Sequence, residues 1–270
     1  MKRLRDHASI ALWCGNNEVD NGWKDWGWQK QFNYSAEDSL RIWNDYTTLF
    51  HKIIPQKLKD LDQTRAYWPS SPEFGWGHEE ANQQGDSHYW GIWWGEEPFE
   101  VFYEKVPRFM SEYGFQSFPA ISTIDSFSKS EDQFLQSPVI IAHQKHPRGC
   151  QLIEKYMHWY FPVPDSFDDY IYVSQLSQAY GMEMAIKSHR LNKPKCMGTL
   201  YWQLNDCWPV ISWSTIDYYN NWKASLYQLM RLYNQIVIAS ERSEEEIKLF
   251  LVSDFPEAIN GKFVSTVYTI

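Results

Sequence analysis

Short apolar runs alternate with amphipathic segments along most of the chain. From Ser35 to about Leu61, apolar side chains recur every three or four positions, which predicts a helix. Ser35 and Asp38 form a capping sequence at its start, and we expect Pro55 to kink or end it. The same spacing predicts further helical segments at 99–105 (one or two turns), 149–160, 168–189 and 222–233.

The short apolar runs without helical spacing are predicted strands, and polar loop residues follow them. These runs are Ala8–Cys14, Ala66–Trp68, the region of His88–Trp90, Arg108–Glu112 and Met197–Leu204. Strands that alternate with helices are typical of a parallel α/β fold. A closed (β/α)₈ barrel needs eight strands, whereas we count about five.

The pattern changes after Asn234. The segments 236–240, 246–253 and 261–270 alternate apolar and polar residues with no helices between them, which predicts antiparallel β structure. We therefore expect a domain boundary near Tyr233, with one α/β domain over residues 1–233 and the first strands of a β domain over residues 234–270.

Composition excludes some partners. The formal net charge is −9, so no excess of lysine and arginine exists to neutralise nucleic-acid phosphates. No apolar run approaches the length of a membrane span, and the basic N-terminus lacks the apolar stretch of a signal peptide. Four cysteines, at positions 14, 150, 196 and 207, show neither metal-binding nor redox-motif spacing, and the compartment stays unassigned.

Aromatic content is the outlier. The chain holds 15 Trp, 17 Tyr and 15 Phe, and many of the tryptophans lie in sequence that is typical of loops. A flat ring covers the C–H face of a sugar and leaves its hydroxyl groups free for hydrogen bonds, so these loops indicate a carbohydrate site. The alternative is that some of these rings only pack beneath long loops.

Two glutamates stand out by position. Glu18 follows the first predicted strand through Gly15-Asn16-Asn17, and Glu112 ends the fourth. In a parallel sheet both would lie at the same rim, and two facing carboxyl groups are what glycoside hydrolysis requires. On position alone, a solvated surface charge is the better-supported interpretation of either residue.

Three motifs change that balance. Trp13–Glu18 (WCGNNE) closely resembles the acid/base motif of the β-mannosidase branch of glycoside hydrolase family 2. Ser111–Ser117 (SEYGFQS) resembles the nucleophile motif of the same branch, and Thr199–Pro209 (TLYWQLNDCWP) resembles its last barrel strand. The resemblance runs from about residue 3 to at least Tyr233.

The resemblance implies a partial TIM barrel. The predicted strands would be barrel strands 4 to 8 in chain order, and residues 234–270 would begin an immunoglobulin-like β-sandwich. Glu18 would be the general acid/base, Glu112 the nucleophile, and Asn17 a hydrogen-bond partner of the sugar 2-hydroxyl. Trp202 would be the hydrophobic platform under the sugar.

Further pocket walls are implied more weakly. Trp26, Trp90 and Trp94 are expected to line the pocket, and His88 to reach the sugar. For these residues, packing beneath the loop is nearly as well supported. His143 and His146 could face one side of a helix, but no third ligand lies nearby in the sequence, so we predict no metal site.

The implied chemistry has two steps and retains configuration. Glu112 attacks the anomeric carbon while Glu18 protonates the departing oxygen, and Glu18 then activates water. The carboxyl groups are expected about 5–5.5 Å apart, and no cofactor is needed. The expected substrate is a terminal β-mannoside of an oligosaccharide or glycan.

The chain departs from the family pattern. Barrel strands 1 to 3 and the preceding β domains have no counterpart here, so we interpret the chain as a fragment. Open edges of such a sheet favour self-association or a missing piece. Two alternatives remain: an inactive sugar-binding remnant, and a related family 2 activity on β-galactosides, β-glucuronides or glucosaminides.

Overall fold

A computed structural model describes residues 1–242 and 246–266 of the chain. The α-helices are α1 Val19–Lys24, α2 Trp28–Gln31, α3 Ala36–Thr47, α4 Ile54–Leu61, α5 Ile121–Asp125, α6 Pro138–Ala142, α7 Gly149–Tyr160, α8 Phe167–Leu191 and α9 Ala224–Leu232. The strands are β1 Leu12–Cys14, β2 Ala66–Trp68, β3 Ser87–His88, β4 Met110–Glu112, β5 Ile236–Arg242 and β6 Ile247–Ser253. The 3₁₀ segments are η2 Glu79–Asn82, η3 Phe99–Tyr103 and η4 Ser130–Asp132.

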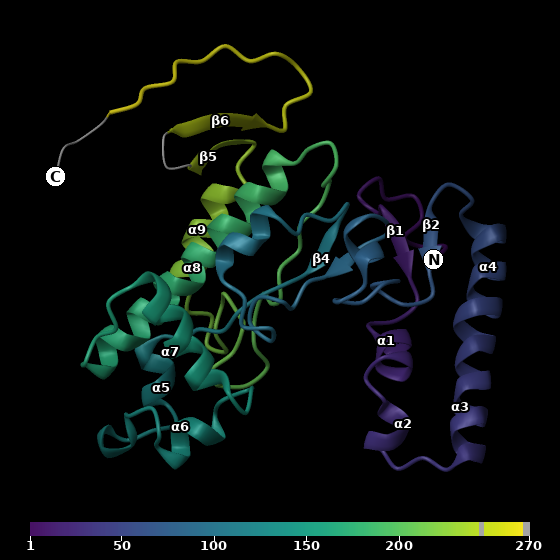
Figure 1. Cartoon of the computed structure of the whole chain (residues 1–270), viewed down its shortest axis with the longest axis horizontal. Coiled ribbons are helices and arrows are strands. Elements are labelled where there is room, and N and C mark those ends of the chain that lie inside the picture. The colour runs from purple at the N-terminus through teal and green to yellow at the C-terminus, as the bar shows by residue number, and fades with distance from the viewer. Residues whose placement is uncertain (243–245, 267–270) are drawn as a thin grey trace.

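The helix predicted from residue 35 is confirmed. Ser35 is its N-cap, because the side-chain oxygen accepts a hydrogen bond from the Asp38 N–H at 3.0 Å. The helix does not end at Pro55: after the π-helical segment η1 Thr48–Ile53 it continues as α4 to Leu61, and Pro55 lies in the first turn of α4. Figure 1 shows α3 and α4 as one rod beside β1 and β2.

The strands of the first part of the chain are parallel. β1 pairs with β2 in the register Leu12↔Ala66 to Cys14↔Trp68, and β3 pairs with β4. Parallel strands followed by helices place the fold in the α/β class. Glu18 lies in the loop that follows the carboxyl end of β1, and Glu112 is the last residue of β4.

The strand predicted at Met197–Leu204 is wrong as an extended element. Within the described residues, this segment forms one isolated bridge to β4, Met110↔Thr199. The Leu200 N–H still donates to the Met110 carbonyl at 2.8 Å, so the segment runs beside β4. Because the segment pairs with β4 at only a few residues, it does not form the continuous series of backbone hydrogen bonds that defines a strand.

Helix α8 is central to the core, and it packs against α7, α9 and η3. Its Gly181 allows close approach, because a Cβ there would lie 2.5 Å from Phe115 and 2.6 Å from Phe99. Large aromatic side chains fill this region, including Phe99, Phe102, Tyr113, Phe115 and Tyr156. Figure 1 shows α5 to α9 on the opposite side of β4 from α3 and α4.

The predicted antiparallel β segment is confirmed as the hairpin β5–β6, paired from Ile236↔Ser253 to Arg242↔Ile247. Val237 and Ala239 are buried. Of the third predicted strand at 261–270, residues 261–266 are irregular, and 267–270 lie outside the described residues.

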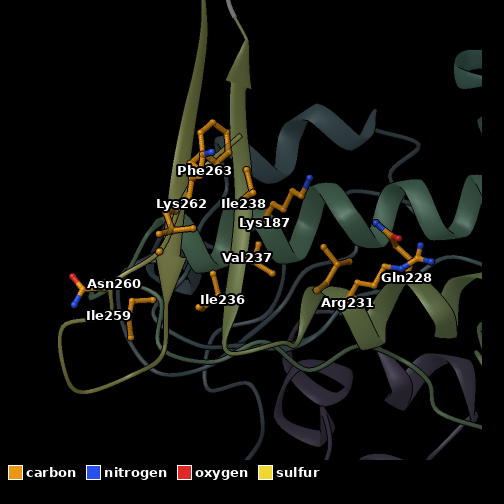
Figure 2. A pocket seen from close by; sticks show the side chains of 13 residues that line it. Lys187, Gln228, Arg231, Ile236, Val237, Ile238, Ile259, Asn260, Lys262 and Phe263 are labelled. Carbon is orange, nitrogen blue, oxygen red and sulfur yellow. The ribbon is translucent and has the colours of Figure 1, made fainter. Parts of the chain in front are cut away.

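A cavity lies beside this hairpin. It measures about 780 Å³, and Figure 2 shows Lys187 and Arg231 on its helical side and Ile236 to Ile238 on the hairpin side. Its lining, among the residues that the structure describes, holds no carboxylate. Among the helices that the structure describes, none is long and apolar enough to cross a membrane.

Candidate active site

Glu18 sits where the chain leaves β1 and enters α1. Its φ of 59° lies in the left-handed region, which is uncommon for a residue other than glycine. Its N–H donates to the Ser71 carbonyl at 2.9 Å, and Asn17 forms a parallel bridge to Ser71. The loop after β2 therefore holds the backbone of Glu18 in place.

The side chain of Asn16 reinforces this loop. Its Oδ1 accepts from the Val19 N–H at 3.1 Å and from the Ser70 hydroxyl at 3.0 Å. Its Nδ2 donates to the Pro69 carbonyl at 2.7 Å and to the Tyr46 hydroxyl at 3.1 Å. Both polar atoms of the Asn16 side chain therefore make hydrogen bonds. These bonds connect the turn before Glu18 to the start of α1, to the loop after β2 and to α3.

Glu112 is the last residue of β4. Its carbonyl accepts the Tyr89 N–H at 2.8 Å, and its Oε1 accepts the Trp90 indole N–H at 3.1 Å. Burial raises the pKa of the Glu112 carboxyl, and the charge of Glu18 raises it further. Electrostatic attraction to His88 and the hydrogen bond from Trp90 lower that pKa, so they oppose the effect of burial.

His88 lies between the two carboxylates. Its Nδ1 is 2.8 Å from Glu18 Oε1 and 3.8 Å from Glu112 Oε1, and its side chain is only 4% exposed. One donor atom of each of the three residues lies within 4.8 Å of the others, a spacing that a metal ion could also bridge. Two carboxylates this close can also act on one glycosidic bond.

Polar groups also contact His88 on the Nε2 side of its ring, opposite Glu18. Its Nε2 lies 3.2 Å from Ser71 Oγ, and the Ser71 hydroxyl donates to Asp86 Oδ2 at 2.5 Å. The Ser111 hydroxyl donates to the same Asp86 oxygen at 2.7 Å. Ser71 and Asp86 therefore link the loop after β2 to the start of β3, and Ser111 adds β4.

A cavity of about 620 Å³ opens over the carboxylates. It contains every site residue predicted from the sequence: Asn17, Glu18, Trp26, His88, Trp90, Trp94, Glu112 and Trp202. It also contains residues that the sequence analysis did not select: Asn21, Gly75, Trp76 and Trp213.

Six tryptophans line the cavity, and they differ in exposure, with Trp90 partly buried. Trp26, Trp76, Trp94 and Trp202 are between 43% and 52% exposed, so their faces are free for a ligand. Trp213 is 8% exposed and lies edge to face with Trp90. The exposed rings offer the flat apolar surfaces that sugars stack on, and the buried ring supports the wall behind them.

The alternative of mere packing can be judged ring by ring. Trp93 is fully buried and stacks on Tyr156, so it belongs to the core. Its neighbour Trp94 is 49% exposed at the cavity and rests edge to face on His146 at 4.2 Å. His88 is almost fully buried, and its Nδ1 lies 2.8 Å from Glu18 Oε1.

The two histidines of the 143–146 segment make separate contacts. His143 stacks on Phe127 at 3.7 Å, and its Nδ1 lies 2.7 Å from the Pro209 carbonyl. His146 is buried, and its Nδ1 accepts the Arg148 N–H at 3.0 Å. Burial lowers the pKa of His146. These contacts support the loops that surround the cavity.

Trp76 and Trp213 had different signals in the sequence. Trp76 lies in the loop after β2 between Gly75 and Gly77, and its position in sequence typical of loops is the signal that points to it. Trp213 lies in Ser212-Trp213-Ser214, which carries no motif of its own. Only the fold brings that segment back under Trp90.

Comparisons with known proteins agree on one group. No family model matches the chain. It is 32% identical to β-mannosidase B of Neosartorya fischeri and of Aspergillus clavatus, over 91% of this chain and 30% of either relative. Among solved structures, a β-D-mannosidase from Dictyoglomus thermophilum is 35% identical, with a TM-score of 0.77 over 93% of this chain and 30% of that one.

A more distant neighbour shares the fold. The exo-chitosanase of Amycolatopsis orientalis superposes with a TM-score of 0.57 over 92% of this chain at 14% identity. On the evidence of sequence and structure together, the chain resembles one part of β-mannosidases over 91% to 93% of its own length, and it spans about 30% of the length of the curated relatives that it matches.

Proposed function

We propose that this chain carries the catalytic site of a retaining exo-β-mannosidase, which releases terminal mannose from β-mannosides. The observation that carries the proposal is the pair Glu18 and Glu112, with carboxylate oxygens within 4.8 Å of each other at the base of a tryptophan-lined cavity. Retaining glycosidases hold their carboxyl groups about 5–5.5 Å apart, whereas inverting enzymes need about 6.5–9.5 Å to admit water.

In the first step, Glu112 acts as the nucleophile. Its carboxylate attacks the anomeric carbon, the bond to the leaving oxygen breaks, and Glu18 gives its proton to that oxygen. In the second step, Glu18 takes a proton from water, and the hydroxide displaces Glu112 from the sugar. The configuration at the anomeric carbon is retained, and the reaction needs no cofactor.

The electrostatics put one requirement on Glu112. It must be ionised to attack, yet burial raises its pKa. The Trp90 N–H and His88 oppose this rise, so both contacts favour the ionised form of the nucleophile. Loss of either contact should therefore reduce the ionised fraction of Glu112.

Substrate binding follows from the cavity walls. We assign Asn17 to the sugar 2-hydroxyl and Trp202 to the platform beneath the first sugar. Trp26 and Trp94 would face the leaving group. The exposed faces of these tryptophans, between 43% and 52%, support such stacking.

For the architecture, we propose that residues 1–233 form strands 4 to 8 of a (β/α)₈ barrel, and that residues from 234 onward begin an immunoglobulin-like β-sandwich. The parallel pairs β1–β2 and β3–β4 and the bridge from Met110 to Thr199 support this order. Open edges of the partial barrel would favour self-association.

The test is hydrolysis of 4-nitrophenyl β-D-mannoside by the 270-residue chain, with product configuration followed by ¹H NMR. We expect turnover with the β-anomer of mannose formed first. Hydrolysis of a β-galactoside, β-glucuronide or β-glucosaminide in preference would favour the related activities. Sugar binding without any turnover would contradict the proposal and favour an inactive remnant.

A further inference from the structure

The hydrogen bonds around Ser71 fix where one proton of His88 lies. A carboxylate only accepts, so the 2.5 Å contact between Ser71 Oγ and Asp86 Oδ2 uses the single hydrogen of the hydroxyl. Towards His88, Ser71 Oγ can then only accept. The 3.2 Å contact between His88 Nε2 and Ser71 Oγ therefore places a hydrogen on Nε2.

This assignment has a consequence on the other side of the ring. In a neutral imidazole with its hydrogen on Nε2, Nδ1 carries a lone pair. Glu18 Oε1 faces Nδ1 at 2.8 Å, and an ionised carboxylate also offers only lone pairs. Two acceptors at this distance repel each other unless a hydrogen lies between them.

We propose that His88 is a positioning residue that shares one proton with Glu18, between Nδ1 and Oε1, and that this is the proton that Glu18 delivers to the leaving oxygen. The inference rests on the proposed function for its role in catalysis. The two ways of drawing the pair, protonated Glu18 beside neutral His88 or ionised Glu18 beside cationic His88, differ only in the position of that hydrogen.

Over one turnover, the Glu18–His88 pair loses one proton and regains one. When the glycosidic bond breaks, the shared proton moves to the leaving oxygen, and ionised Glu18 is left facing the lone pair of neutral His88. This arrangement makes Glu18 a better base for the second step. When water attacks the glycosyl-enzyme, its proton returns to the Glu18–His88 pair, and the resting state is restored.

Acidic groups face His88 from several elements. Glu18 approaches from the end of β1 and Glu112 from β4, at 2.8 Å and 3.8 Å from Nδ1. Asp86 acts through Ser71, and the thiol of Cys14 also contacts Ser71. Burial raises the pKa of the Cys14 thiol to about 11, so the negative charge around the ring belongs to the carboxylates and not to this thiol.

The direct test is NMR of protein with ¹⁵N-labelled histidine rings. The chain has eight histidines, and His88→Asn identifies the signal of interest. In the wild type we expect Nε2 to be protonated and Nδ1 to show a shared hydrogen. In Glu18→Gln, Nδ1 should become a simple acceptor with the hydrogen still on Nε2.

Two results would overturn the proposal: a neutral ring with its hydrogen on Nδ1 and none on Nε2, or a His88 signal that Glu18→Gln does not change. Both results come from NMR spectra and need no enzymatic activity. The variant His88→Asn serves only to identify the signal of His88. A chain that shows the shared hydrogen but no hydrolysis would refute the proposed function and leave proton sharing intact.

Kinetics supply the second arm. In His88→Asn, the basic limb of kcat/KM should move to lower pH, because Glu18 alone holds the proton less tightly, and the loss should be larger for poor leaving groups. The control His158→Asn changes an exposed histidine on α7. If His88→Asn lowered activity equally at every pH and for every leaving group, the role of His88 would be structural only.

Discussion

Trp90 donates its indole N–H to Oε1 of Glu112 at 3.1 Å. This contact joins a wall of the cavity to the proposed nucleophile, and it lowers a pKa that burial raises. A residue that the resemblance implies as a wall of the pocket therefore also lowers the pKa of the carboxyl group that it contacts.

Replacement of Trp90 by Phe tests this link. A hydrogen bond to a charged group contributes about 1.5–3 kcal/mol, so we expect kcat/KM to fall roughly tenfold or more. Since the contact lowers the pKa of Glu112, its loss raises that pKa, and the acid limb of kcat/KM should move to higher pH. Trp222→Phe, at an exposed ring outside the cavity, is the control. An unmoved acid limb would refute the link.

Replacement of the two glutamates should separate their roles. Glu112→Ala should abolish turnover of every β-mannoside, because no nucleophile remains. Glu18→Ala should lower kcat on poor leaving groups by about 100-fold to 10,000-fold, and much less on a dinitrophenyl mannoside, because general acid catalysis matters little there. Steady-state kinetics on both substrates decide the matter: equal losses in Glu18→Ala would undo the acid/base assignment.

The close approach at Gly181 predicts a stability effect. A Cβ at this position would meet Phe115 at 2.5 Å and Phe99 at 2.6 Å. Overpacking costs about 1–3 kcal/mol, while alanine in place of helical glycine gains about 1 kcal/mol, so Gly181→Ala should lower the free energy of unfolding. Denaturant titration measures it. Gly261→Ala, where the new Cβ meets open space, should be neutral.

Lys223 predicts a pH dependence of stability. It is 1% exposed, its Nζ donates to the Ser117 carbonyl at 3.1 Å, and burial lowers its pKa to about 8. The unfolded chain binds this proton up to a pH near 10.5, so stability from this group rises as pH increases from 8 towards 10.5, by about 3 kcal/mol in full.

The comparison with Lys223→Met isolates that contribution. The free energy of unfolding of the wild type, measured relative to the variant, should increase between pH 8 and pH 10. Differences between the two proteins also cancel the titration of tyrosines, which acts in the opposite direction above pH 10. A constant difference across this range would show that Lys223 is not held in a perturbed state.

Long periodic segments were predictable from the sequence. The helix at 149–160 is confirmed as α7, and the apolar run at 66–68 as β2. The short helices α1, α2, α5 and α6 were not predicted, because four to six residues do not complete two turns and give no periodic signal. The predicted strand at 197–204 failed because its pairing depends on a neighbour, not on its own sequence.

The positions of the candidate site residues were predictable from motifs, and their environment was not. The sequence motifs identify Glu18 and Glu112, and both residues line one cavity. His88 lines the cavity, as expected of a residue that could reach the sugar, but its contacts with Glu18 and Ser71 were not predictable. Which of two adjacent tryptophans, Trp93 or Trp94, faces the cavity depends on backbone geometry that sequence does not specify.

The most direct test of the central claim is to trap the intermediate. The chain is incubated with a 2-deoxy-2-fluoro-β-mannosyl fluoride, digested, and the labelled peptide is identified by mass spectrometry. We predict a single fluoromannosyl group, attached to Glu112. A label on another carboxylate, or a folded chain that acquires no label at all, would contradict the assignment of Glu112 as the nucleophile.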